Sequence, residues 1–318
     1  MYDVTATGEL LIDFTRNGLS EQNNRIYEAN PGGAPCNVLA MLGKLDYKTA
    51  FIGKVGEDEF GKLLKNTITE QKIDASGLIL DPNTKTTLAF VDNDETGDRS
   101  FSFYRKPGAD MMLREDEVNY ELIDSCRIFH FGSLSMTDEP VRSATYAMID
   151  YAKNKNKIIS FDPNLRPPLW ESEELAAKQI WYGIEQCDIL KIADNEIEWL
   201  TGTDDYDKGI EIIRQRTHAK LINVTLGPNG SIAYYGDHKV FMEPYLNENT
   251  IETTGAGDTF GACALHAVLK NGLDNMTEED LKEMLQFANA AASLVTTKKG
   301  ALRVMPEEKE IKELINKY

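Results

Sequence analysis

The stretch Ala50-Phe51-Ile52-Gly53-Lys54-Val55 is followed closely by the spacing Phe60-x-x-Leu63-Leu64-x-x-x-Ile68. The first run is short, largely apolar and rich in β-branched and aromatic residues, which is typical of a buried strand. The second places apolar residues on one face of a helix. A buried strand followed by a helix is the repeating unit of an α/β fold.

The same alternation continues on both sides of this stretch. Further strand-like runs are Arg127 to Phe131, Ile158 to Phe161, Leu221 to Thr225 and Ser231 to Tyr235. Helical spacing recurs at Val141 to Ala152, Ala256 to Leu269 and Leu281 to Leu294. This order predicts an α/β fold with a mostly parallel central sheet and helices on both faces. No repeat or Pro/Gly/Ser-rich linker interrupts it, so residues 1–318 are predicted to form one domain.

One region breaks the alternation and predicts a small antiparallel β lid. Thr86 to Val91 and Ser100 to Tyr104 are strand-like and flank the turn-rich residues Asp92 to Asp98, which is a hairpin pattern. The segment Asp13 to Ala29 is polar with scattered apolar positions. We expect these two parts, roughly residues 13–31 and 84–108, to cover the main sheet as a lid.

Composition narrows the class of protein. The formal net charge of -18 disfavours nucleic acid as a partner, because a polyanion would be repelled. The four cysteines form no C-x-x-C pair, which argues against a disulfide framework or a zinc site and favours a reducing compartment. No signal peptide and no long apolar run is visible. These features predict a cytoplasmic protein without a membrane span.

Two phosphate-binding motifs nearly match. Gly56 to Leu63 has the G-x-x-x-x-G-K spacing of a P-loop but lacks the following Ser or Thr and carries three carboxylates. Gly255-x-Gly257-x-x-Phe260 begins like a dinucleotide fingerprint but lacks the third glycine and places Asp258 where a pyrophosphate would lie. Neither motif is therefore expected to act by its usual mechanism.

The segment Thr253-Thr254-Gly255-Ala256-Gly257-Asp258-Thr259-Phe260 favours different chemistry. Small residues at a helix N-terminus leave backbone N–H groups exposed, and these amides stabilise negative charge on a transferring phosphoryl group. Asp258 beside Gly255, Ala256 and Gly257 is suited to accept a proton from an attacking hydroxyl. By itself the segment leaves two interpretations, because Asp258 can also be a helix cap.

An N-terminal element predicts a place for the hydroxyl-bearing substrate. Gly32 and Gly33 precede a helix and allow close approach to the backbone. Asn37 in the first helical turn can hydrogen-bond hydroxyls, and Asp13 after the apolar run Glu9 to Ile12 can accept two of them. The alternatives are an ordinary glycine turn with a solvated Asn37, and an Asp13 that merely ends a strand.

Taken in order, these elements resemble the two signatures of the ribokinase (PfkB-type) carbohydrate kinases. The resemblance covers essentially the whole chain, including Gly53 to Gly61, and implies a ribokinase-like fold. Asn195-x-x-Glu198 resembles the motif that organises Mg²⁺ and phosphate through water. Thr225-x-Gly227-x-x-Gly230 resembles the nucleotide loop, and the run containing Asn289 resembles the helix beside the adenine. The resemblance therefore implies ATP and Mg²⁺ as cofactors.

Within this family the chain is most similar to fructokinases, through the segments from Phe101 to Asp110 and from Phe161 to Pro167. The likeness implies that Phe103 and Arg105 reach the sugar from the lid, and that Arg166 bridges substrate and phosphate as a catalytic residue. It also implies that Lys191 lies near the nucleotide phosphates. Taken by themselves, these cations at strand ends are equally compatible with salt bridges. Relatives that bind K⁺ usually carry Asp at the position of Glu252, so a K⁺ site there stays open.

The sequence thus predicts an ATP-dependent sugar kinase, foremost a fructokinase that makes fructose 6-phosphate, with Asp258 as general base. Alternatives are a kinase for 2-keto-3-deoxygluconate, ribose, tagatose or a nucleoside, and a sugar-binding regulator without catalysis. The resemblance also implies a homodimer in which two lids pack together.

Overall fold

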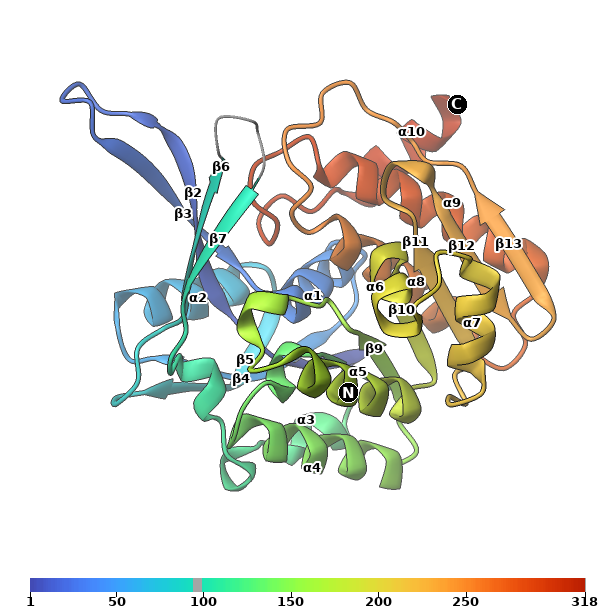
Figure 1. The fold of residues 1–318 in the computed structure, drawn as a ribbon, viewed down its shortest axis with the longest axis horizontal. Coiled ribbons are helices and arrows are strands. Elements are labelled where there is room, and N and C mark those ends of the chain that lie inside the picture. Colours follow the sequence, from blue (N-terminus) through green and yellow to red (C-terminus); the bar gives the residue numbers. More distant parts are fainter. Residues whose placement is uncertain (94–98, 318) are drawn as a thin grey trace.

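A large sheet runs through the middle of the molecule (Figure 1). The computed structural model describes residues 1–93 and 99–317, so residues 94–98 of the predicted turn lie outside the described part. Among the described residues nine strands form the sheet in the order β13-β12-β11-β10-β9-β8-β1-β4-β5. Neighbouring strands are parallel except for β11–β12 and β12–β13. The predicted mostly parallel sheet is therefore confirmed.

The strands of this sheet are β1 (Val4–Thr7), β4 (Thr49–Gly56), β5 (Ile73–Asp81), β8 (Ile128–Gly132), β9 (Ile158–Asp162), β10 (Ile189–Ala193), β11 (Leu221–Thr225), β12 (Ser231–Tyr235) and β13 (His238–Met242). The α-helices are α1 (Ala34–Lys44), α2 (Glu59–Glu70), α3 (Tyr120–Asp124), α4 (Val141–Asn154), α5 (Glu173–Gln186), α6 (Asp194–Thr201), α7 (Tyr206–Arg214), α8 (Ala256–Asn271), α9 (Glu278–Val295) and α10 (Glu308–Lys317).

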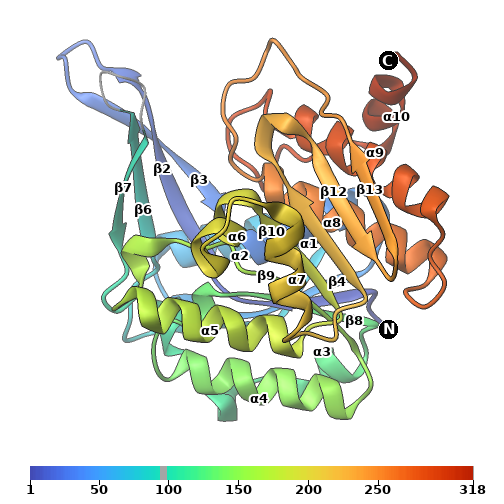
Figure 2. The same ribbon diagram turned by 45° about the vertical axis from the view of Figure 1, so that its right-hand side comes forward.

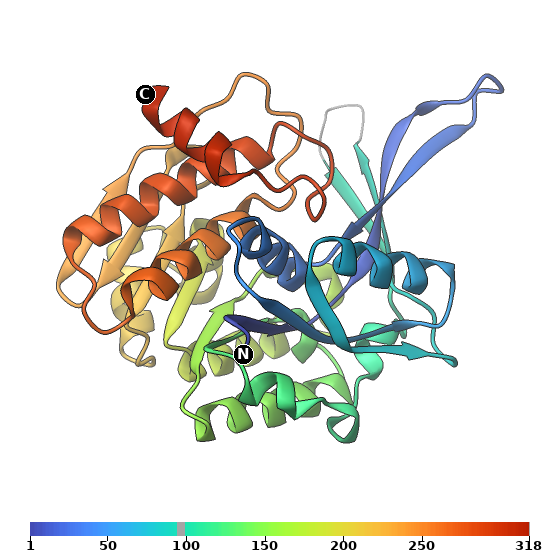
Figure 3. The ribbon, with the colours of Figure 1, turned by 180° about the vertical axis from the view of Figure 1, so that it is seen from behind.

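Helices cover both faces of the sheet, as expected for parallel strands. One buried cluster joins the sheet to α1, α2, α8, α9 and α10, which face the viewer in Figure 3. The other cluster joins it to α3–α7, and Figure 2 shows α4 and α5 along the lower edge of this side. Successive residues of a strand alternate between the two clusters, as Phe51 and Ile52 do in β4.

A second, smaller sheet projects from the body (Figure 1). In the described residues it has four strands in the order β3-β2-β6-β7. They are β2 (Leu11–Leu19), β3 (Arg25–Gly32), β6 (Leu88–Asn93) and β7 (Arg99–Tyr104). β2–β3 and β6–β7 are antiparallel hairpins, and the parallel pair β2–β6 joins them.

Asp13 lies inside a strand and does not end one. The apolar run from Glu9 was expected to stop at Ile12, but β2 continues to Leu19 because its polar half pairs with both β3 and β6. A strand that leaves the core exchanges apolar residues for polar ones without losing its ladder hydrogen bonds. The alternative reading of Asp13 as a strand-end turn residue is therefore wrong.

The segment Gly56 to Leu63, which has the spacing of a P-loop, forms the capped N-terminus of α2. Asp58 caps α2 by accepting from the Gly61 amide at 2.9 Å, and its second oxygen accepts from the Thr86 amide at 2.9 Å. A carboxylate already occupies the place where a phosphate cradle would offer free amides. This segment therefore lacks the free amides of a phosphate cradle.

Candidate active site

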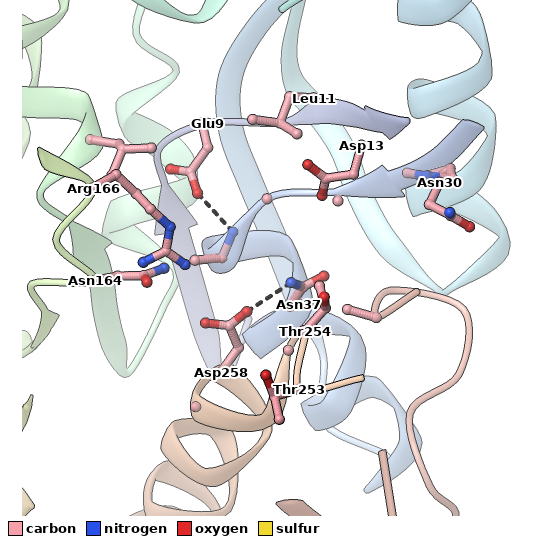
Figure 4. A pocket seen from close by; sticks show the side chains of 18 of the residues that line it. Glu9, Leu11, Asp13, Asn30, Asn37, Asn164, Arg166, Thr253, Thr254 and Asp258 are labelled. Carbon is pink, nitrogen blue, oxygen red and sulfur yellow. Dashed lines mark hydrogen bonds between the residues drawn. The ribbon is translucent and has the colours of Figure 1, made fainter. Parts of the chain in front are cut away.

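The N-terminus of α8 meets the carboxyl ends of the parallel strands beside a cavity of about 230 Å³. This is the edge at which open α/β sheets bind ligands. The small sheet supplies one wall and α1 and α8 supply others (Figure 4). The lining includes ten predicted site residues, namely Asp13, Gly32, Gly33, Asn37, Phe103, Arg166, Lys191, Gly255, Gly257 and Asp258.

Asp258 is buried in the first turn of α8, with 8% of its surface exposed. The Asn37 side-chain amide donates to its Oδ2 at 2.7 Å. Burial and the nearby Asp162 raise the pKa of Asp258 to about 6, against the lowering effects of Asn37, Lys191 and Arg166. A carboxylate with a pKa near neutrality can both hold and release a proton in the physiological range.

The backbone of this turn needs glycine at position 255, whereas position 257 is limited only by a side chain. Gly255 has φ +77°, a left-handed conformation, and a Cβ there would lie 2.6 Å from the Cβ of Ala301. A Cβ on Gly257 would lie 3.0 Å from Nζ of Lys191. The Ala256 amide is less open than expected, because it donates to the Thr253 carbonyl at 3.2 Å.

Lys191 lies in β10 beneath this turn. Its Nζ contacts the two carboxylate oxygens of Asp162 at 3.1 and 3.2 Å. Burial works against its positive charge, but Asp162, Glu196 and Asp258 outweigh burial and raise its pKa. A permanently charged ammonium therefore lies beside the helix end that would receive a phosphate.

The opposite side of the cavity carries polar groups for hydroxyls. Burial raises the pKa of Asp13 to about 7, and the pKa of Glu9 to about 7 as well. A Cβ on Gly32 would lie 2.6 Å from Oδ2 of Asp13. Oδ1 of Asn37 is buried and has no partner among the described residues, which leaves an unused hydrogen-bond acceptor on a residue of the cavity wall.

The predicted arginines differ in position. Arg166 is exposed, lines the cavity and faces it in Figure 4, while its guanidinium donates to the neighbouring Leu165 carbonyl at 3.1 Å. Arg105 does not line this cavity. It is buried at the base of the small sheet and paired with Asp110 at 2.7 Å.

A second cavity of about 310 Å³ lies on the other side of the α8 N-terminus. Lys191 and Gly257 line both cavities, so the two spaces meet at this helix end. Its lining includes Asn195, Thr225, Gly227, Gly230 and Asn289, all predicted to bind ATP, together with Ala193, Asp194, Ala256, Phe260 and Ala292.

Glu198 was also predicted to bind ATP, but it does not line this cavity and its side chain is exposed. The buried acid of α6 is Glu196. Its oxygens accept from the amides of Leu165 at 2.7 Å and Ala193 at 2.8 Å. Glu196 therefore joins the loop that carries Arg166 to the start of α6.

Two further predicted residues have protein partners. The Asn289 side chain accepts from Ser231 at 2.8 Å and donates to the Glu243 carbonyl at 2.9 Å. Glu252 accepts from the Gly300 amide at 2.8 Å. Among the described residues no group of three or more His, Cys, Asp or Glu could hold a metal ion.

The sequence analysis missed several residues of the site. Glu9, Thr15, Asn30, Asn164, Thr253 and Thr254 all line the first cavity. Asn164 has φ 44°, which is unusual for a residue other than glycine. The loop of Asn164 could have been found from the sequence, because it also contains the predicted Arg166. No local pattern distinguishes Glu9 or Asn30 from ordinary surface residues.

Comparison with known proteins gives a consistent family. The model of the pfkB family carbohydrate kinases matches residues 1–308. The chain is 41% identical to a probable fructokinase-2 of Arabidopsis thaliana over 309 residues, which cover 96% of this chain and 94% of the relative.

Solved structures give the same result. A fructokinase from Xylella fastidiosa with bound ATP has a TM-score of 0.90 at 30% identity, covering 100% of this chain and 99% of the other. A double mutant of a fructokinase from Vibrio cholerae, with fructose, ADP and potassium ion bound, has a TM-score of 0.87 at 30% identity, covering 99% and 98%. The predicted ribokinase-like fold is thereby confirmed.

Proposed function

The chain belongs to the pfkB family of carbohydrate kinases, and from this premise we propose that it is an ATP-dependent fructokinase. One observation supports this proposal most strongly. Asp258 is buried in the wall of the first cavity, at the N-terminus of α8 where this cavity meets the second. A kinase needs its base at the junction between acceptor and nucleotide.

The proposed reaction is a direct transfer. Asp258 takes the proton from the sugar 6-hydroxyl, and that oxygen forms a bond to the γ-phosphorus as the bond from phosphorus to the bridging oxygen of ADP breaks. The Gly255 and Gly257 turn and Lys191 stabilise the charge that develops on the phosphoryl oxygens. Arg166, which faces the first cavity, supports the same charge from the side of the sugar.

The second cavity suits ATP. Gly227 and Gly230 have positive φ values of 54° and 97°, and a Cβ on Gly230 would collide with the Met242 carbonyl, so the backbone loop stays bare toward the ligand. Mg²⁺ would neutralise phosphate charge. Its ligands would come mainly from the phosphates and from water, with Asn195 and Glu198 as proposed outer contacts.

The first cavity favours a neutral sugar over an acidic one. Three acids, Glu9, Asp13 and Asp258, line it against the two cations Lys191 and Arg166, and each acid would repel a substrate carboxylate once ionised. Arg105, which could have served such a carboxylate, is paired with Asp110 outside the cavity lining. We therefore rank fructose above 2-keto-3-deoxygluconate as the acceptor.

A coupled assay for ADP release tests the proposed function. The panel contains fructose, ribose, tagatose, 2-keto-3-deoxygluconate and a nucleoside. We expect fructose to give the highest kcat/KM. A higher value for another acceptor would replace fructose, and no turnover with any acceptor would support a binding protein without catalysis.

The K⁺ site is proposed near Glu252. Its carboxylate already holds the Gly300 amide, so it fixes the loop that a bound cation would contact. Turnover in KCl compared with tetramethylammonium chloride tests this proposal, and equal rates would reject it.

We also propose a homodimer formed by the small sheets, and a cytoplasmic location. Leu19, Ile26 and Tyr104 of this sheet are exposed by 50%, 42% and 66%. The four cysteines are unpaired, which fits a reducing compartment. Within the described ranges no helix has the length and apolar character to cross a membrane. Light scattering that gives a monomer mass at assay concentration would reject the dimer.

A further inference from the structure

Arg105 connects the base of the small sheet to the floor of the sugar cavity. It directly follows β7, and each of its guanidinium nitrogens has a protein acceptor. Nε donates to Oδ2 of Asp110 at 2.7 Å, Nη1 to Oγ1 of Thr137 at 3.0 Å, and Nη2 to the Leu134 carbonyl at 2.9 Å. Only 3% of Arg105 is exposed.

Asp110 extends this connection to the other strand of the hairpin. Its Oδ1 accepts from the hydroxyl of Thr87, which directly precedes β6. We call Thr87, Arg105, Asp110, Leu134 and Thr137 the Arg105 cluster. The cluster thus holds the start of β6 and the end of β7 against the segment that follows β8.

The strands held in this way carry residues of the sugar cavity. Phe103 lies two positions before Arg105 on the same side of β7, and it lines the cavity. Asp13 of β2 pairs with Ala89 of β6, so the start of β6 fixes its position too. Leu134, whose carbonyl binds Arg105, lines the floor of the cavity.

We infer that Arg105 is a positioning residue for sugar binding, which sets the small sheet over the cavity without touching the substrate. The guanidinium is suited to this role because it donates in three fixed directions at once. A lysine can keep the ion pair with Asp110 but cannot reach three separate acceptors. The inference rests on the proposed sugar-kinase function and gives Arg105 a role other than the sugar contact expected from the sequence.

The test compares Arg105→Lys with Arg114→Lys, an exposed arginine that is paired with Asp116. For Arg105→Lys we expect the KM for fructose to rise about tenfold, because small displacements of positioning groups weaken productive binding. The KM for ATP should stay within about twofold, since no member of the cluster lines the nucleotide cavity. Arg114→Lys should leave both constants unchanged.

Fructose analogues that each lack one hydroxyl separate positioning from direct contact. If Arg105 acts through the cluster, Arg105→Lys lowers kcat/KM by the same factor for every analogue. If this loss of kcat/KM disappears for one analogue, Arg105 makes a direct hydrogen bond to the missing hydroxyl and the inference is overturned.

Thr137→Val provides a second, milder variant should Arg105→Lys fail to fold. It removes one acceptor of Arg105 and also the bond of 3.1 Å that Thr137 Oγ1 donates to the Leu134 carbonyl, and it should raise the KM for fructose at least about threefold. An unchanged KM in Thr137→Val also overturns the inference. Absence of sugar phosphorylation in the unmodified protein would instead reject the proposed function itself.

Discussion

The Asn37 side-chain amide donates a hydrogen bond of 2.7 Å to Oδ2 of Asp258, joining two residues that are 221 positions apart in the chain. The bond ties the start of α1 to the start of α8. It occupies one oxygen of the carboxylate and orients the other. The same residue keeps Oδ1 as a buried acceptor without a partner among the described residues. One side chain thus orients the proposed base and keeps an acceptor for the proposed sugar.

Replacement of the base should remove turnover but keep binding. Asp258→Asn preserves the shape of the side chain and its contact with Asn37 while removing its ability to accept a proton. We expect kcat to fall by about 10²–10⁴-fold with little change in the KM for either substrate. Steady-state kinetics check this, with the exposed Asp237→Asn as control. A kcat close to that of the unmodified protein would show that another group takes the proton.

The Asn37 bond should also set the pH dependence. Because the pKa of Asp258 is raised to about 6, kcat should be constant at higher pH and fall as pH drops through this value. The Asn37 bond favours the charged carboxylate and lowers its pKa. Asn37→Ala should therefore move the acid limb of the kcat profile to higher pH.

Measurements at saturating sugar separate this effect from weaker sugar binding. The activity of Asn37→Ala relative to the unmodified protein should be lower at pH 6 than at pH 8. A ratio that does not change with pH would mean that Asn37 acts on binding alone.

Glu196 and Glu198 of α6 should act in different ways. Both oxygens of Glu196 accept backbone N–H groups, so Glu196→Gln places an NH₂ donor against one of these amides. We expect kcat/KM to fall at least about tenfold as the loop carrying Arg166 shifts. Glu198→Gln removes a proposed outer contact of Mg²⁺ but leaves this loop in place, so it should raise the Mg²⁺ requirement. The exposed Glu211→Gln in α7 is the control and should stay within about twofold. An unchanged Mg²⁺ requirement in Glu198→Gln would reject the assignment made from the sequence.

The fold was predictable wherever apolar patterns are decisive. The runs Leu221 to Thr225 and Ser231 to Tyr235 match β11 and β12 residue for residue, because both strands are buried and the turn between them contains glycine. β13 was not identified, since an edge strand such as His238–Met242 can be polar on its open side. β10 is absent from the predicted strand-like runs, because the charged Lys191 interrupts its apolar pattern.

The lining of the first cavity was predictable where the backbone shapes a turn, as at Gly255 and Asp258. It was not predictable where tertiary contacts decide which side chain faces the cavity. Arg105 carries the same charge as Arg166, yet its partners Asp110 and Thr137 are assembled only by the fold. In α6, burial of Glu196 and Ile197 turns Glu198 outward, which the spacing of the motif does not reveal.

The two glycines of the α8 turn should tolerate alanine differently. In Gly255→Ala the backbone keeps a φ of +77°, which is strained for alanine, and the new methyl lies 2.6 Å from that of Ala301. We expect a loss of about 1–3 kcal/mol in the free energy of unfolding together with reduced turnover. In Gly257→Ala the methyl contacts only the end of the Lys191 side chain, Nζ at 3.0 Å and Cε at 3.6 Å.

Gly257→Ala should therefore fold with nearly unchanged stability, yet impair catalysis, because the methyl group lies where both cavities meet. Chemical denaturation and kinetics on the same samples distinguish the two effects. Gly261→Ala is the control within α8, since a Cβ there meets nothing within 4 Å. If Gly257→Ala retained full kcat, the turn would not contact the transferring phosphoryl group, and the charge stabilisation would have to come from Lys191 and Arg166.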